Sequence, residues 1–250
     1  MKEVILQKLR EIECQFDVKI LYACESGSRA WGFASPDSDF DVRFIYVQRI
    51  DHYLSIDEQR DVIELPVNAV LDINGWELRK ALRLFRKSNA PVYEWLQSPI
   101  VYLENDAFSH EVRGFMSNYF SKRAAMHHYL SMAKGVIETE LSGEKVKLKK
   151  YFYALRPLLA AQWIADKNEV PPMEFGRLRE SLPSEINSLI NDFLKKKMEV
   201  DETFRVQRNQ ELDVFIHERL KYCEAKVAVA SSVGDSAPLS ELLKRCVYDA

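Results

Sequence analysis

The chain has 250 residues, of which 47% are hydrophobic and 29% are charged, and its formal net charge at pH 7 is -3. An ordinary apolar content with a small net charge excludes a disordered chain and is typical of a globular protein with a buried core. The sequence has no run of about 18 apolar residues, and charges occur throughout its first turns, so we expect no membrane span, no signal peptide and a cytoplasmic protein. The four cysteines lack CxxC spacing and are expected to be free thiols.

Charge is unevenly distributed along the chain. Residues 1–75 carry 8 basic and 14 acidic side chains, whereas residues 122–167 carry 9 basic and 4 acidic ones. The small net charge therefore does not exclude a nucleic-acid partner, because acidic and basic segments offset each other.

The first hundred residues alternate between helix and strand patterns. Apolar residues three and four positions apart predict an amphipathic helix over residues 3–16. Further along, the patterns predict strands at 18–24, 40–47, 61–65 and 68–73, and a helix at 77–88.

Helical periodicity dominates from about residue 105 to Glu224, and a polar loop at 231–238 precedes a final short helix. We therefore predict an α+β fold with two domains. A mixed-sheet domain is expected over residues 1–105 and an all-helical domain over residues 106–250.

Two carboxylates mark the start of the predicted strand at 40–47. Asp39 and Asp41 are two positions apart, so they share one face of the strand while Phe40 points to the core. Like charges side by side repel each other unless a cation lies between them, and Mg²⁺ favours carboxylate oxygens. Taken alone, this pattern is more often a solvated strand end or turn than a metal site.

Asp72 lies in an apolar predicted strand, where aspartate is disfavoured and a buried charge needs a partner or a metal. If this strand pairs beside residues 40–47, Asp72 faces the same cation site. Three such carboxylates can hold two metal ions about 4 Å apart.

Gly27 and Ser28 follow the first predicted strand and are expected to open a short helix. A glycine permits close backbone approach, a serine hydroxyl donates to phosphate, and helix N-terminal N–H groups favour anions. The pair is also compatible with an ordinary turn, but its position before Asp39 and Asp41 favours a phosphate site next to a metal site.

This order of features resembles the DNA polymerase beta-like nucleotidyltransferase superfamily, whose motif corresponds here to residues 25–72. A narrower resemblance, to the RNA-repair-pathway (RlaP-like) predicted nucleotidyltransferases, extends to about residue 165. The segments that carry it are GSRAWGFASPDSDFDVRFIY, LDINGWELRKAL and KKYFYALRPLLA. The resemblance implies a nucleotidyltransferase palm with a mixed sheet, followed by a helical domain.

The resemblance also implies a reaction and its residues. The family transfers a nucleotidyl group from an NTP such as ATP to an acceptor hydroxyl and releases pyrophosphate. Gly27 and Ser28 match the pair that holds the triphosphate, Asp39 and Asp41 match the two metal-binding carboxylates, and Asp72 matches the third, near the acceptor. The implied cofactor is Mg²⁺, with two ions at the site, or Mn²⁺ in its place.

Two arginines flank these motifs. Arg43 continues the register of Asp39 and Asp41, so it is expected on the same face, as a phosphate contact or as a structural counter-charge. Arg29 follows Ser28 and is placed either to contact phosphate or to form a surface salt bridge.

Lys149, Tyr153 and Arg156 fall on one face of a predicted helix, and Lys150 lies beside them. Lysine supplies a point charge and tyrosine a hydroxyl or a stacking ring, so Lys149, Lys150 and Tyr153 are candidates for nucleotide binding. The alternative is a solvated basic face beside a core tyrosine.

These observations lead to the hypothesis of a Mg²⁺-dependent nucleotidyltransferase with an NTP substrate. An RNA end is the favoured acceptor, on the family resemblance alone. Two alternatives remain: nucleotidylation of a small molecule or protein, and a non-catalytic module that binds nucleotide. The three aspartates argue against the second alternative, since a binding module has no need of all of them.

Overall fold

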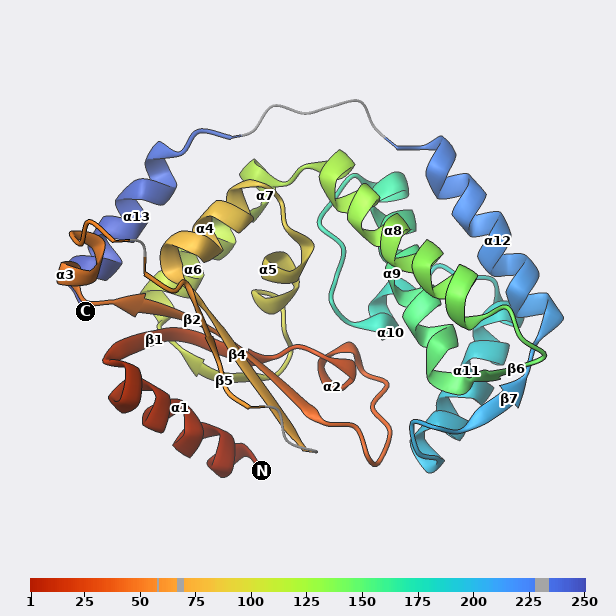
Figure 1. Ribbon diagram of the computed structural model, residues 1–250. Coiled ribbons are helices and arrows are strands. Elements are labelled where there is room, and N and C mark those ends of the chain that lie inside the picture. Colours follow the sequence, from red (N-terminus) through yellow and green to blue (C-terminus); the bar gives the residue numbers. More distant parts are fainter. Residues whose placement is uncertain (58, 67–69, 228–233) are drawn as a thin grey trace. The chain divides into compact units, whose positions relative to one another are not determined.

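The computed structural model describes residues 1–57, 59–66, 70–227 and 234–250 (Figure 1). The beginning of the predicted strand at 68–73 and part of the predicted loop at 231–238 lie outside the described residues. Contacts divide the chain into two units that alternate along the sequence. The first comprises Met1–Gly27, Asp39–Tyr119 and Val233–Ala250, and the second comprises Ser28–Ser38 and Phe120–Ser232.

The first unit is built on a mixed sheet of five strands in the order β3-β4-β2-β1-β5. The strands are β1 (Val18–Glu25), β2 (Phe40–Gln48), β3 (Val62–Glu64), β4 (Leu71–Glu77) and β5 (Val101–Glu104). β2 and β4 run parallel, whereas the other neighbours are antiparallel. The predicted mixed α+β class is confirmed, although β5 was not expected from the sequence.

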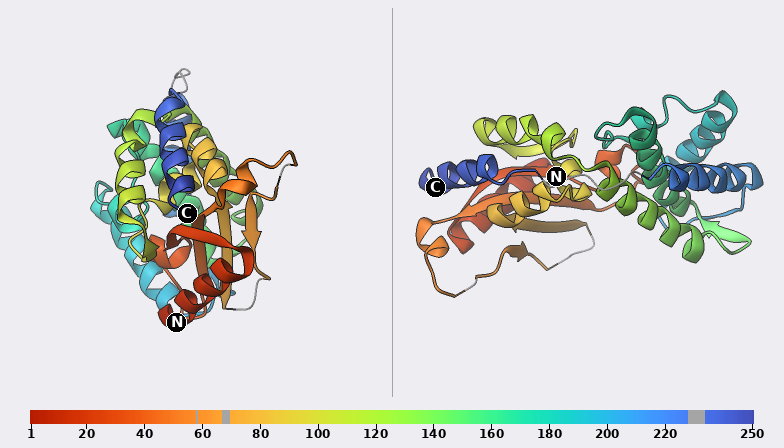
Figure 2. Two further views of the ribbon diagram at one scale, coloured as in Figure 1. Left: turned by 90° about the vertical axis from the view of Figure 1, so that its left-hand side faces the viewer. Right: turned by 90° about the horizontal axis from the view of Figure 1, so that it is seen from above.

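Helices cover both faces of this sheet. The helices of the first unit are α1 (Lys2–Phe16), α3 (Ile50–Tyr53), α4 (Leu78–Arg86), α5 (Ala90–Trp95), α6 (Asp106–Gly114), α7 (Met116–Tyr119) and α13 (Ala237–Tyr248). Seen from above in Figure 2 (right), α4, α6 and α13 lie on the near side of the sheet and α1 lies behind it. The C-terminal helix therefore belongs to the sheet domain, which differs from the single boundary expected near residue 105.

The core beneath α1 fixes which strand residues face the opposite side. Ile5, Leu9 and Ile12 of α1 are at most 1% exposed and pack against a cluster that includes Val42 and Phe44 of β2. Because side chains alternate along a strand, the odd-numbered positions of β2 face away from α1. The aspartate and arginine candidates of β2 occupy those positions.

The second unit is mostly helical. Its elements are α2 (Ser28–Trp31), α8 (Lys122–Glu140), α9 (Leu148–Lys167), α10 (Phe175–Leu178), α11 (Ser184–Glu199), α12 (Gln210–Ala225), and the antiparallel strands β6 (Lys145–Lys147) and β7 (Arg205–Gln207). The predicted helical region after the mixed sheet is confirmed, and it also contains this small two-stranded sheet. Val146 is buried while Lys145 is exposed, so the burial pattern here has the period of a strand.

Aromatic packing joins the segment Ser28–Ser38 to the second unit. Phe33 is 2% exposed, and its ring lies 5.3 Å from that of Phe152 and 5.5 Å from that of Phe175. The Arg156 guanidinium lies 4.4 Å from the Trp31 ring. The chain thus leaves the sheet unit after Gly27 and returns to it at Asp39.

Within the described part of the chain, no helix combines the length and the hydropathy that crossing a bilayer requires.

Candidate active site

Two carboxylates meet on adjacent parallel strands of the first unit. The register of β2 and β4 pairs Asp41 with Asp72. Arg43, two residues further along β2, donates from Nη2 to Asp41 Oδ1 at 3.2 Å and to Asp72 Oδ2 at 2.7 Å. The strand pairing on which the sequence hypothesis depended is therefore present, and both carboxylates converge on one cationic nitrogen.

Gly27 is in close contact with the Asp41 side chain. A Cβ atom at position 27 would lie 1.7 Å from Asp41 Oδ2 and 2.6 Å from its Cγ. The backbone N–H of Ser26 donates to the Asp41 carbonyl at 2.8 Å, which holds the turn against β2. Glycine is required here because any side chain would displace the carboxylate.

Glu25 is a fully buried acid next to these partly buried aspartates, and it could not be recognised as part of the site from the sequence pattern alone. Its side chain is 0% exposed and accepts from the Asp41 backbone N–H at 2.7 Å and from the Tyr102 hydroxyl at 2.5 Å. The Ser98 hydroxyl donates to the Glu25 carbonyl at 2.6 Å. An acid at the end of a buried strand, directly before the glycine turn, was the available sequence signal. Glu25 fixes the backbone from which the Asp41 side chain projects.

The electrostatics of the site favour uptake of a cation. Burial raises the pKa of Asp41 to about 6, and the charges of Asp39, Glu25 and Asp72 act in the same direction. The Arg43 guanidinium opposes this shift. The ionised form of Asp41 is thus destabilised by its surroundings and stabilised by positive charge.

The carboxylate oxygens of Asp41 and Asp72 are ligands of the kind that a hard divalent cation prefers. In the structure, the Arg43 guanidinium nitrogen lies between them. Among the described residues, no group of three or more His, Cys, Asp or Glu side chains is arranged to hold a metal ion. The structure therefore shows two carboxylates, those of Asp41 and Asp72, converging on one position. Asp39 directly precedes β2, and its role as a further ligand stays a prediction.

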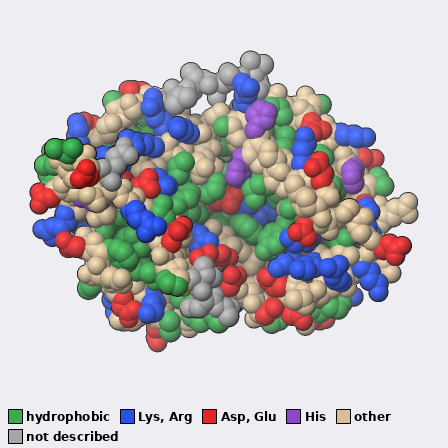
Figure 3. Space-filling view, viewed as in Figure 1, with side chains coloured by type: hydrophobic (Ala, Val, Ile, Leu, Met, Phe, Trp, Pro, Cys, Tyr) green, Lys and Arg blue, Asp and Glu red, His purple; other side chains and the backbone are tan. Residues whose placement is uncertain are grey.

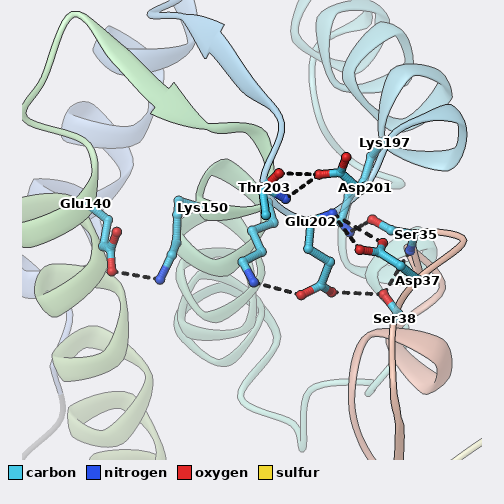
Figure 4. A network of polar contacts seen from close by, with 10 residues as sticks. Ser35, Asp37, Ser38, Glu140, Lys150, Lys197, Asp201, Glu202 and Thr203 are labelled. Atoms are coloured by element: carbon cyan, nitrogen blue, oxygen red, sulfur yellow. Dashed lines mark hydrogen bonds and ion pairs between the residues drawn. The ribbon is translucent and has the colours of Figure 1, made fainter. Parts of the chain in front are cut away.

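The lysine candidates of the second unit both form ion pairs. Lys149 Nζ donates to Glu202 Oε2 at 2.7 Å, and Glu202 Oε1 accepts from the Ser38 hydroxyl at 2.9 Å. Lys150 Nζ donates to Glu140 at 2.7 Å. Figure 4 shows Glu202 next to Ser38, with the Lys150–Glu140 pair to one side. Glu202 was not identified from the sequence, because it lies far along the chain from its partners.

Further bonds hold the segment that leads to Asp39. Lys197, 3% exposed, donates to the Ser35 hydroxyl at 2.6 Å, and the Glu202 backbone N–H donates to the Asp37 carboxylate at 3.1 Å (Figure 4). Burial lowers the pKa of Lys197, and the Glu202 charge opposes that shift. These contacts anchor Ser35 to the end of α11, and Ser38 and Asp37 to Glu202 in the loop after it.

The remaining candidates of the second unit have structural contacts as well. Arg29 donates to the Ser38 carbonyl at 2.5 Å, and Ser28 is 5% exposed. The Tyr153 ring lies 6.0 Å from that of Trp31 in an edge-on arrangement. Arg156, expected on the same face as Lys149, is 2% exposed and donates to the Met173 carbonyl, so it is part of the core.

The ten candidate residues thus divide between the units. The first unit contains Gly27, Asp39, Asp41, Arg43 and Asp72, and the second contains Ser28, Arg29, Lys149, Lys150 and Tyr153. In the first unit, Gly27, Asp41, Arg43 and Asp72 form one connected cluster. The functional roles of all ten remain predictions.

A family model described as "RlaP: RNA repair pathway DNA polymerase beta family" matches residues 1–245. The chain belongs to the RlaP family. This confirms the resemblance seen in the motifs of the N-terminal part. The RlaP match also extends well beyond residue 165, through the helical unit and into the C-terminal helix of the sheet unit.

Two known proteins are similar to this RlaP-family chain. A Bacillus subtilis (strain 168) protein named "Uncharacterized protein YcgL" is 49% identical over 214 residues, which cover 86% of this chain and 80% of that protein. A crystal structure of a nucleotidyltransferase-like protein from Exiguobacterium sibiricum 255-15 aligns with a TM-score of 0.33 and 12% identity, covering 96% of this chain and 75% of that one. At that level of similarity, no residue role is transferred from the second protein to this chain.

Proposed function

We propose that this RlaP-family protein is a Mg²⁺-dependent nucleotidyltransferase that moves an NMP from an NTP to an acceptor hydroxyl and releases pyrophosphate. The observation that carries the proposal is the convergence of Asp41 and Asp72 on one cation position, with Gly27 packed against Asp41. Membership of a DNA polymerase beta-type family supports the same chemistry.

In this proposal Asp39, Asp41 and Asp72 hold two Mg²⁺ ions, or Mn²⁺ in their place. When bound, such ions neutralise phosphate charge and make an acceptor hydroxyl more acidic. Glu25 keeps the Asp41 carboxylate oriented through its backbone N–H. The pair Gly27 and Ser28 holds the triphosphate by backbone and hydroxyl donors.

The reaction is an in-line displacement. The acceptor oxygen bonds to the α-phosphorus while the bond to pyrophosphate breaks, and Asp72 helps to remove the hydroxyl proton. Arg29, Arg43, Lys149 and Lys150 supply positive charge to the triphosphate, and Tyr153 supplies a hydroxyl or a stacking ring. Rate enhancement comes mainly from positioning and charge stabilisation, as is general for phosphoryl-group chemistry.

The proposed acceptor is the end of an RNA strand. The support is the family description, which names an RNA repair pathway. Transfer to a small molecule or to a protein would use the same carboxylates. The acceptor is therefore identified by a labelling experiment, because the geometry of the carboxylates does not distinguish these cases.

The test is incubation of the purified protein with each NTP, labelled at the α-phosphate, and Mg²⁺ or Mn²⁺. Candidate acceptors are RNA oligonucleotides with defined ends, small-molecule alcohols and the protein itself. Label is expected on RNA, and Asp41→Asn and Asp72→Asn are expected to abolish it. Asp51→Asn, which alters an exposed aspartate of α3, is the matched control and is expected to retain activity.

Three results decide among the alternatives. Label on an alcohol or on protein instead of RNA reassigns the acceptor. NTP binding without transfer to any acceptor identifies a nucleotide-binding module. Transfer that is undiminished in Asp41→Asn contradicts the catalytic role of the cluster.

A further inference from the structure

Three arginines of α4 share one face of the helix and border a groove in the first unit. Arg79, Arg83 and Arg86 stand at positions i, i+4 and i+7. They line a groove of about 310 Å³ together with residues of α13, and the described residues that line it include no acidic side chain. Lys and Arg side chains are visible at the upper left of Figure 3, where Figure 1 places α4 and α13.

The arginines are held in place without losing their charge. Arg86 Nε donates to the Gly234 carbonyl at 2.9 Å, and the Arg79 guanidinium lies 4.8 Å from the Tyr53 ring. Arg83 is exposed. Among the described residues, none of the three guanidinium groups forms an ion pair with a carboxylate. The charge of the row is therefore available to a ligand.

Acidic residues on the other side of Arg79 and Arg83 do not cancel this charge. A smaller cavity there is lined by Asp57, Asp61 and Glu77. Asp61 pairs with Lys80 at 2.9 Å, and the Glu77 carboxylate accepts the first N–H groups of α4. These two carboxylates are thus occupied by other donors, and the third, Asp57, is exposed to solvent.

The groove is suited to phosphate groups in a row. Arginine binds phosphate in a bidentate manner, and Ser236 adds a hydroxyl group of the kind that contacts nucleic-acid backbones, whereas the Ser240 hydroxyl at the rim donates to the Ser236 carbonyl at 2.9 Å. From Arg79 to Arg86 the helix rises about 10.5 Å, which is more than a single phosphate can span. The row therefore matches consecutive phosphates of one strand.

The floor of the groove is apolar and largely covered. Leu82 and Leu239 line it and are only 5% and 4% exposed, whereas the partly buried Leu243 leaves some apolar surface beside the arginines. The start of α13 adds no anion site of its own, because the Asp235 carboxylate already accepts the Ala237 N–H at 3.1 Å. Attraction in the groove comes from the arginines.

We propose that this arginine groove, formed by Arg79, Arg83, Arg86, Ser236 and Ser240, binds the phosphate backbone of single-stranded RNA. It is separate from the carboxylate cluster, since β4 alone carries the chain about 17 Å from Asp72 to Glu77, just before α4. The inference rests on the proposed function only in taking RNA as the acceptor.

The test measures binding without catalysis. A fluorescent single-stranded RNA of about 16 nucleotides is titrated with protein by fluorescence anisotropy, in EDTA and without nucleotide, at several salt concentrations between about 50 and 200 mM. The variant Arg79→Ala/Arg83→Ala/Arg86→Ala is compared with Lys2→Ala/Lys8→Ala/Arg10→Ala. The second variant removes the same charge from α1, on the opposite face of the sheet.

The α4 variant is expected to bind about tenfold or more weakly at the lower salt, and the slope of log K against log salt is expected to fall by about 2, since each single-strand phosphate contact contributes about 0.7. The α1 control is expected to keep the wild-type slope. Arg83→Glu tests the same point at an exposed residue, so it remains informative if loss of the Arg86 bond impairs folding.

Equal losses in the α4 and α1 variants, or an unchanged slope in Arg83→Glu, would overturn the groove assignment. Displacement of RNA by poly-glutamate of equal charge and equal affinity would assign the groove to an acidic protein instead. RNA binding that depends on the arginines, with no label transfer from NTP, supports the groove and contradicts the proposed function. Label transfer from NTP, with RNA binding that does not depend on the arginines, supports the proposed function and contradicts the groove assignment.

Discussion

Asp41 and Asp72 lie opposite each other on parallel strands, and their carboxylates accept hydrogen bonds from the same nitrogen of Arg43. Two adjacent carboxylates on a sheet repel each other, so this arrangement costs stability unless a positive charge compensates. In the structure the compensation comes from Arg43. The relationship leads to separate expectations for stability, metal binding and activity.

The substitution Asp41→Asn is expected to separate stability from function. Burial raises the pKa of Asp41 to about 6, so its ionised form is disfavoured in the folded protein and the neutral amide removes that cost. We expect a melting temperature equal to or above that of the wild type in metal-free buffer, followed by circular dichroism. Transfer activity is expected to fall by about a hundredfold or more. A clearly lower melting temperature would show that the charge stabilises the fold.

The substitution Arg43→Gln is expected to strengthen divalent-metal binding. A bound cation and the guanidinium compete for the same two carboxylates, so removing Arg43 relieves the competition. Mn²⁺ binding, followed by electron paramagnetic resonance without nucleotide, is expected to tighten about fivefold, or about 1 kcal/mol.

The pH dependence of this effect has a defined sign. Arg43 lowers the pKa of Asp41, so its removal raises that pKa further above its ordinary value. The gain in Mn²⁺ affinity is therefore expected at about pH 8 and is expected to shrink as the pH falls through the raised Asp41 pKa of the variant, which lies above the wild-type value of about 6. Arg49→Gln, at an exposed residue of the same unit, is the control. Weaker binding at the higher pH would mean that Arg43 orients the carboxylates instead of competing for them.

Gly27→Ala is expected to lower the proposed transfer activity while leaving the protein folded. The added Cβ would lie 1.7 Å from Asp41 Oδ2, so the carboxylate must rotate away from Arg43 and Asp72. Mn²⁺ affinity and transfer activity are expected to fall together, about tenfold or more.

Gly135→Ala makes the same change in α8, where nothing lies within 4 Å of the new atom. It is expected to stabilise the helix by about 0.5–1 kcal/mol and to leave activity unchanged. Full activity in Gly27→Ala would be incompatible with the close approach of the turn to Asp41.

Glu202→Gln is expected to loosen the network that holds Lys149 and Ser38. Burial alone would raise the pKa of Glu202, but the hydrogen bonds from Lys149 and Ser38 lower it overall. A lowered pKa in the folded state means that the carboxylate stabilises the fold above its ordinary pKa of 4.5 and loses this effect as the pH falls.

Urea unfolding measures this contribution. At neutral pH we expect Glu202→Gln to lose about 1 kcal/mol, and the difference from the wild type is expected to vanish well below pH 4.5. Glu140→Gln, which breaks the more exposed pair with Lys150, is the control and is expected to have little effect. A difference that persists unchanged in acid would assign the loss to packing instead of charge.

The sequence alone predicted the elements that local patterns determine. The period of two placed Asp41 and Arg43 on one face of β2, and apolar spacing placed Ile5, Leu9 and Ile12 in the core. The sequence did not determine that β4 runs parallel to β2 in the register that joins Asp41 to Asp72. That register depends on packing across the whole sheet.

Contacts between distant residues could not be predicted from local patterns. Lys149 has the spacing of a ligand-facing residue, but its partner Glu202 lies 53 positions away, in a loop whose position only the fold defines. Arg156 has the same helical phase and lies in the core, because its guanidinium packs on Trp31. The sequence pattern predicts a helix at Val146. The strand β6 has only three residues, which are too few for the alternation of buried and exposed side chains to be recognised in the sequence.

The assignment of Ser28–Ser38 to the second unit has a consequence for dissecting the protein. No continuous stretch of the gene encodes either unit alone, since the sheet unit is interrupted after Gly27 and is completed by α13. A fragment that ends at Tyr119 would leave Phe33 without Phe152 and Phe175 and would expose a large apolar ring. The smallest fragment expected to remain soluble with an intact site is therefore close to the full length of the chain.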